Sequence, residues 1–113
     1  MITIEDIKKW SKPHPSDQNG RVTNIFNRKY ELSIVGGGRG LYGDFEKTFE
    51  IAIFDSQDHK FITKFFFPES GDDVVGYVSG KDLEDFANVL FRNDDFQVRW
   101  NLVVDASQTC EPN

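Results

Sequence analysis

Cysteine, long apolar runs and catalytic signatures are all scarce in this chain of 113 residues. Its single cysteine, Cys110, excludes an intramolecular disulfide, and Cys110, His14 and His59 are too few to build a Cys/His metal cluster. The longest apolar runs, FFF and LVV, are too short to span a membrane, and the polar start MITIEDIKKW does not resemble a signal peptide. We therefore expect a cytoplasmic protein that uses no metal or other cofactor.

Positive charge is also scarce. The formal net charge is −6, and it is unevenly spread: residues 1–47 carry eight Lys/Arg and six Asp/Glu, whereas residues 48–113 carry five and thirteen, giving +2 and −8. Such a chain repels nucleic-acid phosphates, so direct nucleic-acid binding is not expected. A basic protein surface is the natural partner, although acidity also keeps a small domain soluble.

Aromatic residues, in contrast, are plentiful, with eleven phenylalanines in the chain. Rings bury more area per residue than other side chains, so we expect them to fill a core built on a sheet. The length fits one domain, which we place at residues 1–104, followed by a flexible polar tail at 105–113.

Two helices are predicted from caps and spacing. The first is capped by Thr3, with Asp6 completing a capping box, and its apolar side carries Ile4, Ile7 and Trp10. The second opens at Ser79 with Asp82 three residues on, and ends near Asn93. Its apolar residues recur at i, i+3, i+4 and i+7, namely Leu83, Phe86, Ala87 and Leu90.

Alternating apolar and polar residues predict the strands. They lie at 21–34, interrupted or bulged near Asn27, at 45–54, at 61–67 and at 96–102, with a short extra strand at 74–78 and a turn at 16–20. The strands at 45–54 and 61–67 should form a hairpin. The order α-β-β-β-(β)-α-β predicts an α+β two-layer sandwich, with a mainly antiparallel sheet of about four or five strands and two helices on one face.

The stretch VGGGRGLYGDF contains the pattern G-x-G-x-x-G at Gly38, Gly40 and Gly43. A dinucleotide-binding loop needs a helix after the glycines, but the alternation in DFEKTFEIAIF predicts a strand there. A protein-kinase loop does join two strands, yet Phe54 occupies the position of the phosphate-pairing lysine. The stretch is therefore interpreted as a glycine-rich connection between two strands, not as a nucleotide site.

Two roles for this connection stay open. Arg39 and Tyr42 could project as a recognition loop, because Arg and Tyr are preferred at protein–protein hot spots. Alternatively, Leu41 and Tyr42 could fold back onto the core of a wide turn.

No catalytic constellation emerges from the remaining polar residues. The adjacent pairs Asp72-Asp73 and Asp94-Asp95 fall in predicted loops, where such acids form turns. Asp58 and Lys60 have a D-x-K spacing, but they fall at a turn, and the acidic charge opposes a nuclease role. We therefore expect a non-enzymatic protein.

The acids of the second part form the more informative group: ten acids and four bases lie between Asp55 and Asp95. If they share a face, they would present spaced negative charge to a basic partner and steer its approach. The predicted partner-binding residues are Arg39, Tyr42, Asp55, Asp58, Glu69, Asp72, Asp73, Asp82, Asp85, Asp94 and Asp95.

The small size, the acidity, the abundant Phe and the run GLYGDFEKTFEIAIFD resemble small accessory proteins of tailed bacteriophages, T-even-like ones in particular. That resemblance implies an intracellular protein, made during infection, that binds and alters a host factor. The leading hypothesis is thus an acidic binding protein for a basic nucleic-acid-handling or defence factor. The alternatives are an immunity protein or antitoxin that neutralises a cognate toxin, or a structural component of a particle or oligomer.

Overall fold

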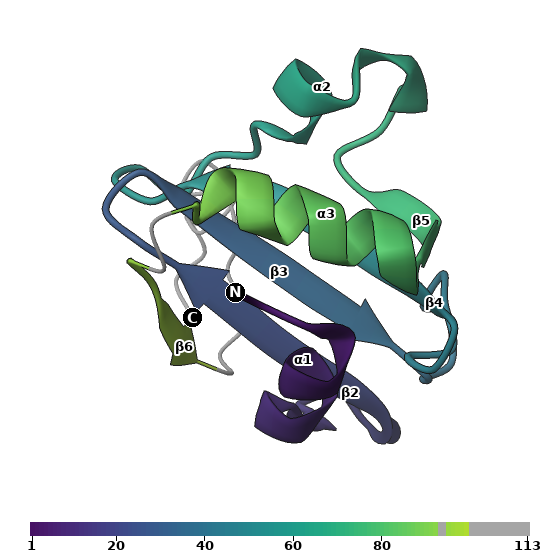
Figure 1. Ribbon diagram of the computed structural model, residues 1–113. Helices are drawn as coiled ribbons and strands as arrows, with labels where there is room; N and C mark the ends of the chain where they lie inside the picture. Colours follow the sequence, from purple (N-terminus) through teal and green to yellow (C-terminus); the bar gives the residue numbers. More distant parts are fainter. Residues whose placement is uncertain (93–94, 100–113) are drawn as a thin grey trace, which may run out of the picture.

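Six strands, all within the described residues 1–92 and 95–99 of the computed structural model, form one antiparallel sheet (Figure 1). They are β1 (Lys12–His14), β2 (Asp17–Phe26), β3 (Tyr30–Gly36), β4 (Thr48–Asp55), β5 (Val75–Ser79) and β6 (Gln97–Arg99). Strands β1 to β5 lie in chain order, and β6 pairs with the end of β2 that β1 leaves uncovered. The predicted α+β class with a mainly antiparallel sheet is confirmed.

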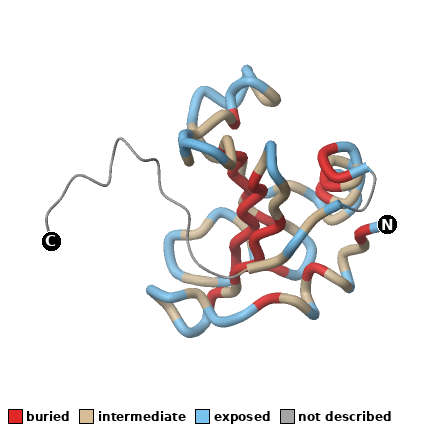
Figure 2. Tube along the Cα trace, turned by 90° about the vertical axis from the view of Figure 1, so that its left-hand side faces the viewer, coloured by how far each residue is buried: buried red, intermediate tan, exposed pale blue. Residues whose placement is uncertain are grey.

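Helices α1 (Ile4–Trp10) and α3 (Gly80–Leu90) cover one face of the sheet, as predicted (Figure 1). The short helix α2 (Thr63–Phe66) and the 3-10 turn η1 (Pro68–Ser70) follow β4. Figure 2 shows the buried residues along the central strands and on the side of α3 that faces them. This core combines residues of both helices and three strands: Ile7, Ile25, Leu32, Ile34, Phe49, Ile51, Ile53, Leu83, Ala87 and Leu90.

Both predicted helix starts are confirmed by their hydrogen bonds. The Thr3 hydroxyl accepts the N–H of Asp6 at 3.1 Å, and the Asp6 carboxylate accepts the N–H of Thr3 at 3.1 Å. At α3, the Ser79 hydroxyl accepts the N–H of Asp82 at 3.1 Å. Local side chains thus satisfy donors that the first helical turns leave without partners.

The predicted interrupted strand at 21–34 is in fact a hairpin of β2 and β3. Asn27 makes the turn, because its side-chain oxygen accepts the N–H groups of Lys29 and Tyr30, both at 2.9 Å. In addition, β2 begins at Asp17, inside the predicted turn at 16–20. Of the last strand predicted at 96–102, Gln97–Arg99 form β6, and Phe96 directly precedes that strand. The prediction for 100–102, like Asn93 and the tail, lies outside the described residues.

The predicted strand at 61–67 is wrong. Only Phe61 makes a bridge, to Phe54, and the chain then turns into α2. The reason is Thr63, whose hydroxyl accepts the N–H of Ile53 at 2.9 Å and replaces the backbone partner that a strand would offer. Because the chain coils here instead of extending, Phe65 is 84% exposed.

A buried ion pair lies on the face of the sheet that α1 and α3 leave uncovered. Glu31 of β3 is 1% exposed, and its carboxylate accepts hydrogen bonds from the Nε and Nη2 atoms of Arg99 in β6. The side-chain amide of Asn24 donates a further hydrogen bond to Glu31 at 2.9 Å. The Arg99 guanidinium also lies 4.7 Å from the centroid of the Phe26 ring. These contacts connect β6 to the two central strands.

The glycine-rich stretch connects β3 to β4, which confirms the predicted β–β connection. Its path is set by Gly43, which has a φ of 154° and lies against the backbone of Phe49, where a Cβ would come within 2.8 Å of the Phe49 Cα. The Gly43 carbonyl also accepts the N–H of Gly37 at 2.8 Å, closing the loop. Glycine is therefore required here by packing and backbone geometry.

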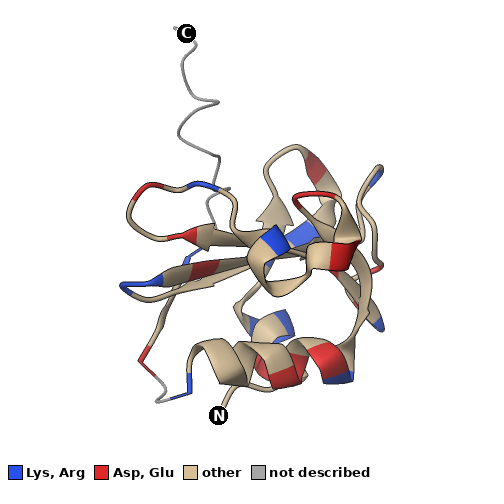
Figure 3. Cartoon of the chain, turned by 90° about the horizontal axis from the view of Figure 1, so that it is seen from above, with Lys and Arg blue, Asp and Glu red and all other residues tan. Residues whose placement is uncertain are grey.

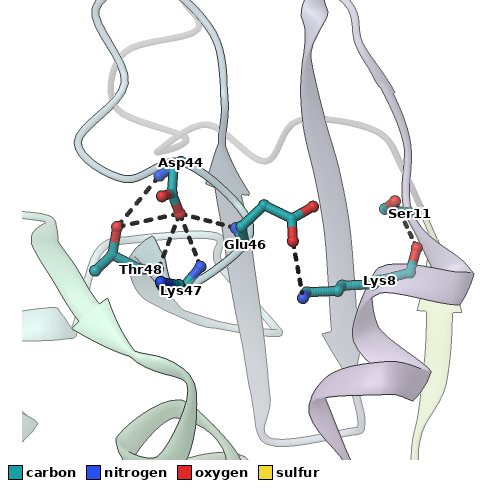
Figure 4. Close-up of polar contacts among 6 residues, drawn as sticks. All are labelled: Lys8, Ser11, Asp44, Glu46, Lys47 and Thr48. Carbon is teal, nitrogen blue, oxygen red and sulfur yellow. Dashed lines mark hydrogen bonds and ion pairs between the residues drawn. The ribbon is translucent and has the colours of Figure 1, made fainter.

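Asp44 fixes the end of this loop (Figure 4). Its carboxylate accepts the N–H groups of Glu46 and Lys47 at 2.9 Å and of Thr48 at 3.0 Å. These backbone donors, with Thr48 first, hold the pKa of the Asp44 carboxyl well below its usual range. Because the ionised form is the one that the turn stabilises, Asp44 links the order of this loop to pH.

We expect Gly43→Ala to lower the free energy of unfolding by about 3 kcal/mol, because the methyl group meets backbone that cannot move aside. Gly40→Ala is the matched control: its φ of 81° carries strain, but nothing lies within 4 Å of the added methyl. That variant should lose about 1 kcal/mol. Urea unfolding measures both, and equal losses would contradict the close approach at Gly43.

Asp44→Asn should lower the melting temperature at neutral pH, where the wild-type carboxylate is ionised. The folded-state pKa lies below that of the unfolded chain, about 3.9 for Asp, so the contribution is complete above that pH and is lost as the pH falls through the folded value. The two melting curves should therefore converge below about pH 4. Calorimetry from pH 7 to pH 2 tests this, and a difference that stays constant would refute the linkage.

Arg99→Met should destabilise the fold by about 2 to 3 kcal/mol, because it leaves the Glu31 carboxylate buried without its cation. The double variant Glu31→Leu/Arg99→Met should recover most of this loss, since it removes both charges. Denaturant titration of the two variants decides the point. If the double variant were as unstable as the single one, the shape of the side chains would matter here and not their charge.

Candidate functional site

A groove of about 590 Å³ lies between α3 and the edge strand β5. Its floor is apolar and consists of Ile51, Phe67, Val75, Val78 and Phe86. Gly76, Tyr77, Ser79, Asp82, Asp85 and Val89 complete the lining. An apolar hollow flanked by a few charged side chains is typical of binding sites. The acids of α3 are the red segments of the long helix at the bottom of Figure 3, beside the label N.

Helix α3 forms one wall of the groove because one of its sides packs on the sheet and a second side borders the groove. Leu83, Ala87 and Leu90 are buried against the sheet. Asp82, Asp85, Phe86 and Val89 also recur at i, i+3, i+4 and i+7, so they line up along a second side that borders the groove. Val89, an apolar residue in the last turn of α3, is 59% exposed there.

The other wall of the groove is supported by the glycine-rich loop. Tyr77 of β5 has a φ of 55°, and its N–H donates to the Tyr42 carbonyl at 2.8 Å instead of to a strand. Tyr42 lies over Gly76, and a Cβ added at Gly76 would come within 2.6 Å of the Tyr42 Cβ. The N–H of Tyr42 donates to the Glu50 carboxylate at 2.8 Å. The Tyr42 and Tyr77 rings lie 6.1 Å apart, and their exposed fractions are 51% and 67%. The loop thus docks on β5 and leaves a tyrosine pair at the groove.

The predicted partner-binding residues divide into separate groups. Tyr42 (through Tyr77), Asp82 and Asp85 lie at the groove. Glu69, Asp72 and Asp73 lie on η1 and the connection that leads into β5. Asp55 is the last residue of β4, Asp58 lies in the turn that follows, and Asp95 lines a different pocket near the β2–β3 turn. Asp94 lies outside the described residues.

Arg39 is not part of the groove. It lines a separate hollow with His14 and Asp17, and its N–H donates to the Asp17 carboxylate at 2.8 Å. Together with the N–H of Asn19, this bond lowers the pKa of the Asp17 carboxyl. The two residues that project from the glycine-rich loop therefore belong to different surfaces: Arg39 lines this hollow, whereas Tyr42 lies against Tyr77, which lines the groove.

Tyr77 and Val89 were missed by the sequence reasoning, which assigned Phe86 to the core alone. One signal could have found Val89: together with Asp82, Asp85 and Phe86 it forms a second stripe on α3, next to the buried one. The position of Tyr77 had no such signal, because it depends on the contact between Tyr42 and Gly76, which are far apart in the sequence.

The described part of the chain offers neither a metal-binding cluster nor a helix that could cross a membrane. It contains no group of three or more His, Cys, Asp or Glu side chains placed to hold a metal ion. None of the helices within residues 1–92 and 95–99 has the length and hydrophobicity that a membrane crossing requires. Comparisons with protein-family models, with curated proteins and with solved structures give no match.

Proposed function

We propose that this protein is a non-enzymatic binding protein that holds a basic amphipathic helix of a partner protein in the groove between α3 and β5. The observation that carries the proposal is the combination of an apolar floor with two acids, Asp82 and Asp85, and no cation in the lining. In keeping with the phage resemblance, we place the protein in the cytoplasm of an infected host. Its partner there is a basic nucleic-acid-handling or defence factor.

The apolar floor supplies the affinity in this proposal. Phe67, Val75 and Phe86 are only partly buried against the core, so a partner side chain would remove apolar surface from water. Tyr42 and Tyr77 flank the site, and tyrosine is enriched among residues whose removal weakens protein complexes. A helical segment presents apolar side chains at i, i+3 or i+4 and i+7, and such a row suits an elongated groove.

The acids supply the specificity. Asp85 pairs with Lys81 at 3.3 Å, but both side chains are mostly exposed, so this ion pair is weak and can be exchanged for one with a partner. The net charge of −8 over residues 48–113 adds a long-range attraction for a basic segment. Association should therefore slow and weaken as the salt concentration rises.

A synthetic amphipathic helix of Lys and Leu tests the proposal, with a Glu/Leu helix of the same pattern as its counterpart. The full-length protein should bind the basic helix in fluorescence anisotropy, with amide shifts on β5 and α3, and should not bind the acidic one. Asp82→Asn/Asp85→Asn should weaken binding about tenfold, as expected for two partly screened ion pairs. The control Glu5→Gln/Glu46→Gln removes two exposed acids elsewhere and should change little.

If the two double variants weakened binding equally, the attraction between the protein and the basic helix would be non-specific. That result would refute binding in the groove. Val89→Asp provides a second test, because it places a charge beside the apolar floor at an exposed position. It should abolish binding while leaving the melting temperature within a few degrees of wild type. A host protein captured from lysate counts as the partner only if Val89→Asp releases it and the control variant retains it.

A further inference from the structure

A second hollow lies at the opposite end of β4 from the groove. It is a pocket of about 510 Å³ between the β2–β3 turn, the turn that follows β4, and β6. Its lining includes two arginines, Arg28 and Arg99, two acids, Glu31 and Asp95, and also His59, Phe26 and Phe96. None of these residues belongs to the groove, so the two sites are independent.

Arg99 is held in place before any ligand arrives. Its Nε and Nη2 atoms donate to Glu31, and its guanidinium lies over the Phe26 ring at 4.7 Å. The side chain is still 35% exposed, and its Nη1 atom makes no hydrogen bond to any described residue. A guanidinium fixed on one edge and one face can bind an anion through its remaining donors with little loss of conformational freedom.

The turn that forms the opposite wall shows signs of a role other than stability. Ser56 Oγ and His59 Nδ1 are buried and have no hydrogen-bond partner within the described part of the chain. His59 also has a φ of 60°, in the left-handed region. In folded proteins nearly all buried polar atoms have a hydrogen-bond partner. Residues other than glycine that adopt the left-handed region cluster at functional sites such as ligand-binding sites.

The charges of the pocket differ from those of the rest of this acidic protein. Glu31 is paired with Arg99, so the other charged residues of the lining are Arg28 and Asp95. The groove, in contrast, is lined by two acids and no cation. The rings of Phe26 and Phe96 add apolar surface beside the guanidinium groups.

We propose that this pocket binds a small organic anion, in which a carboxylate or phosphate group is attached to an apolar or aromatic body. Arg99 and Arg28 contact the anionic group, and the Phe26 and Phe96 rings contact the body. Carboxylate and phosphate share the planar or forked acceptor geometry that a guanidinium matches.

Titration of the full-length protein with benzoate, phenyl phosphate, inorganic phosphate and benzyl alcohol tests this proposal by amide NMR. Benzoate or phenyl phosphate should give saturable shifts in residues 26–28, 56–59 and 97–99, and the tighter of the two identifies the anionic group. Benzyl alcohol should give no saturable shift, and inorganic phosphate should bind more weakly than phenyl phosphate.

Arg28→Gln should weaken binding of the tighter anion about tenfold, the effect of losing one charge-assisted hydrogen bond. Arg39→Gln is the matched control, since it removes an exposed arginine from a different hollow. The proposal is overturned if neither aromatic anion produces saturable shifts, if benzyl alcohol binds as well, or if the two arginine variants behave alike. Arg28 is exposed in a turn, so its variant should keep the wild-type amide spectrum and give a clear result.

Discussion

Burial of the central strand β3 on both faces is the constraint on which the rest of this structure depends. Leu32 and Ile34 face the helices and form the core, whereas Glu31 and Ser33 face the other way and are buried as well. A carboxylate in that position needs a cation and further donors, because an isolated buried charge is very unfavourable. Arg99 of β6 supplies that cation, and β6 pairs with β2. The position of β6 is therefore tied to the buried Glu31 carboxylate of β3.

The same strand order gives the two ends of the molecule different chemistry. At one end, β4 begins beside β5 and the groove; at the other, it ends in the turn whose Ser56 and His59 border the second pocket. The groove is acidic because α3 turns Asp82 and Asp85 toward it, while the pocket collects guanidinium groups from a hairpin turn and from β6. A chain with a large negative net charge thus has one hollow lined by two acids and no Lys or Arg, and another in which two arginines accompany two acids. Net charge alone would have suggested only the first.

Local signals in the sequence were sufficient for α1 and α3 and for most of the sheet. Caps at Thr3 and Ser79 and the apolar spacing of α3 act within a few residues, so they can be predicted without knowledge of the fold. The failures occurred where one side chain replaced backbone pairing. Asn27 folds a continuous alternating pattern into a hairpin, and Thr63 occupies the place of a partner strand beside Ile53. The alternating pattern at 61–67 could not show which backbone groups Thr63 would satisfy, and it did not report burial either, since Phe65 is exposed.

The candidate site was predicted only in part, because counting acids does not show which of them are available to a partner. Asp44, Asp55 and Asp58 accept backbone N–H groups in their own turns, which occupies the carboxylate oxygens that a partner would need. Among the described residues, Asp82 and Asp85 accept no backbone N–H, and both border an apolar floor. Tyr42 reaches the same place because the glycine-rich loop docks on β5, a contact between distant parts of the chain. Asp44, Asp55 and Asp58 therefore contribute to their own turns, whereas Asp82 and Asp85 are the acids that line the groove.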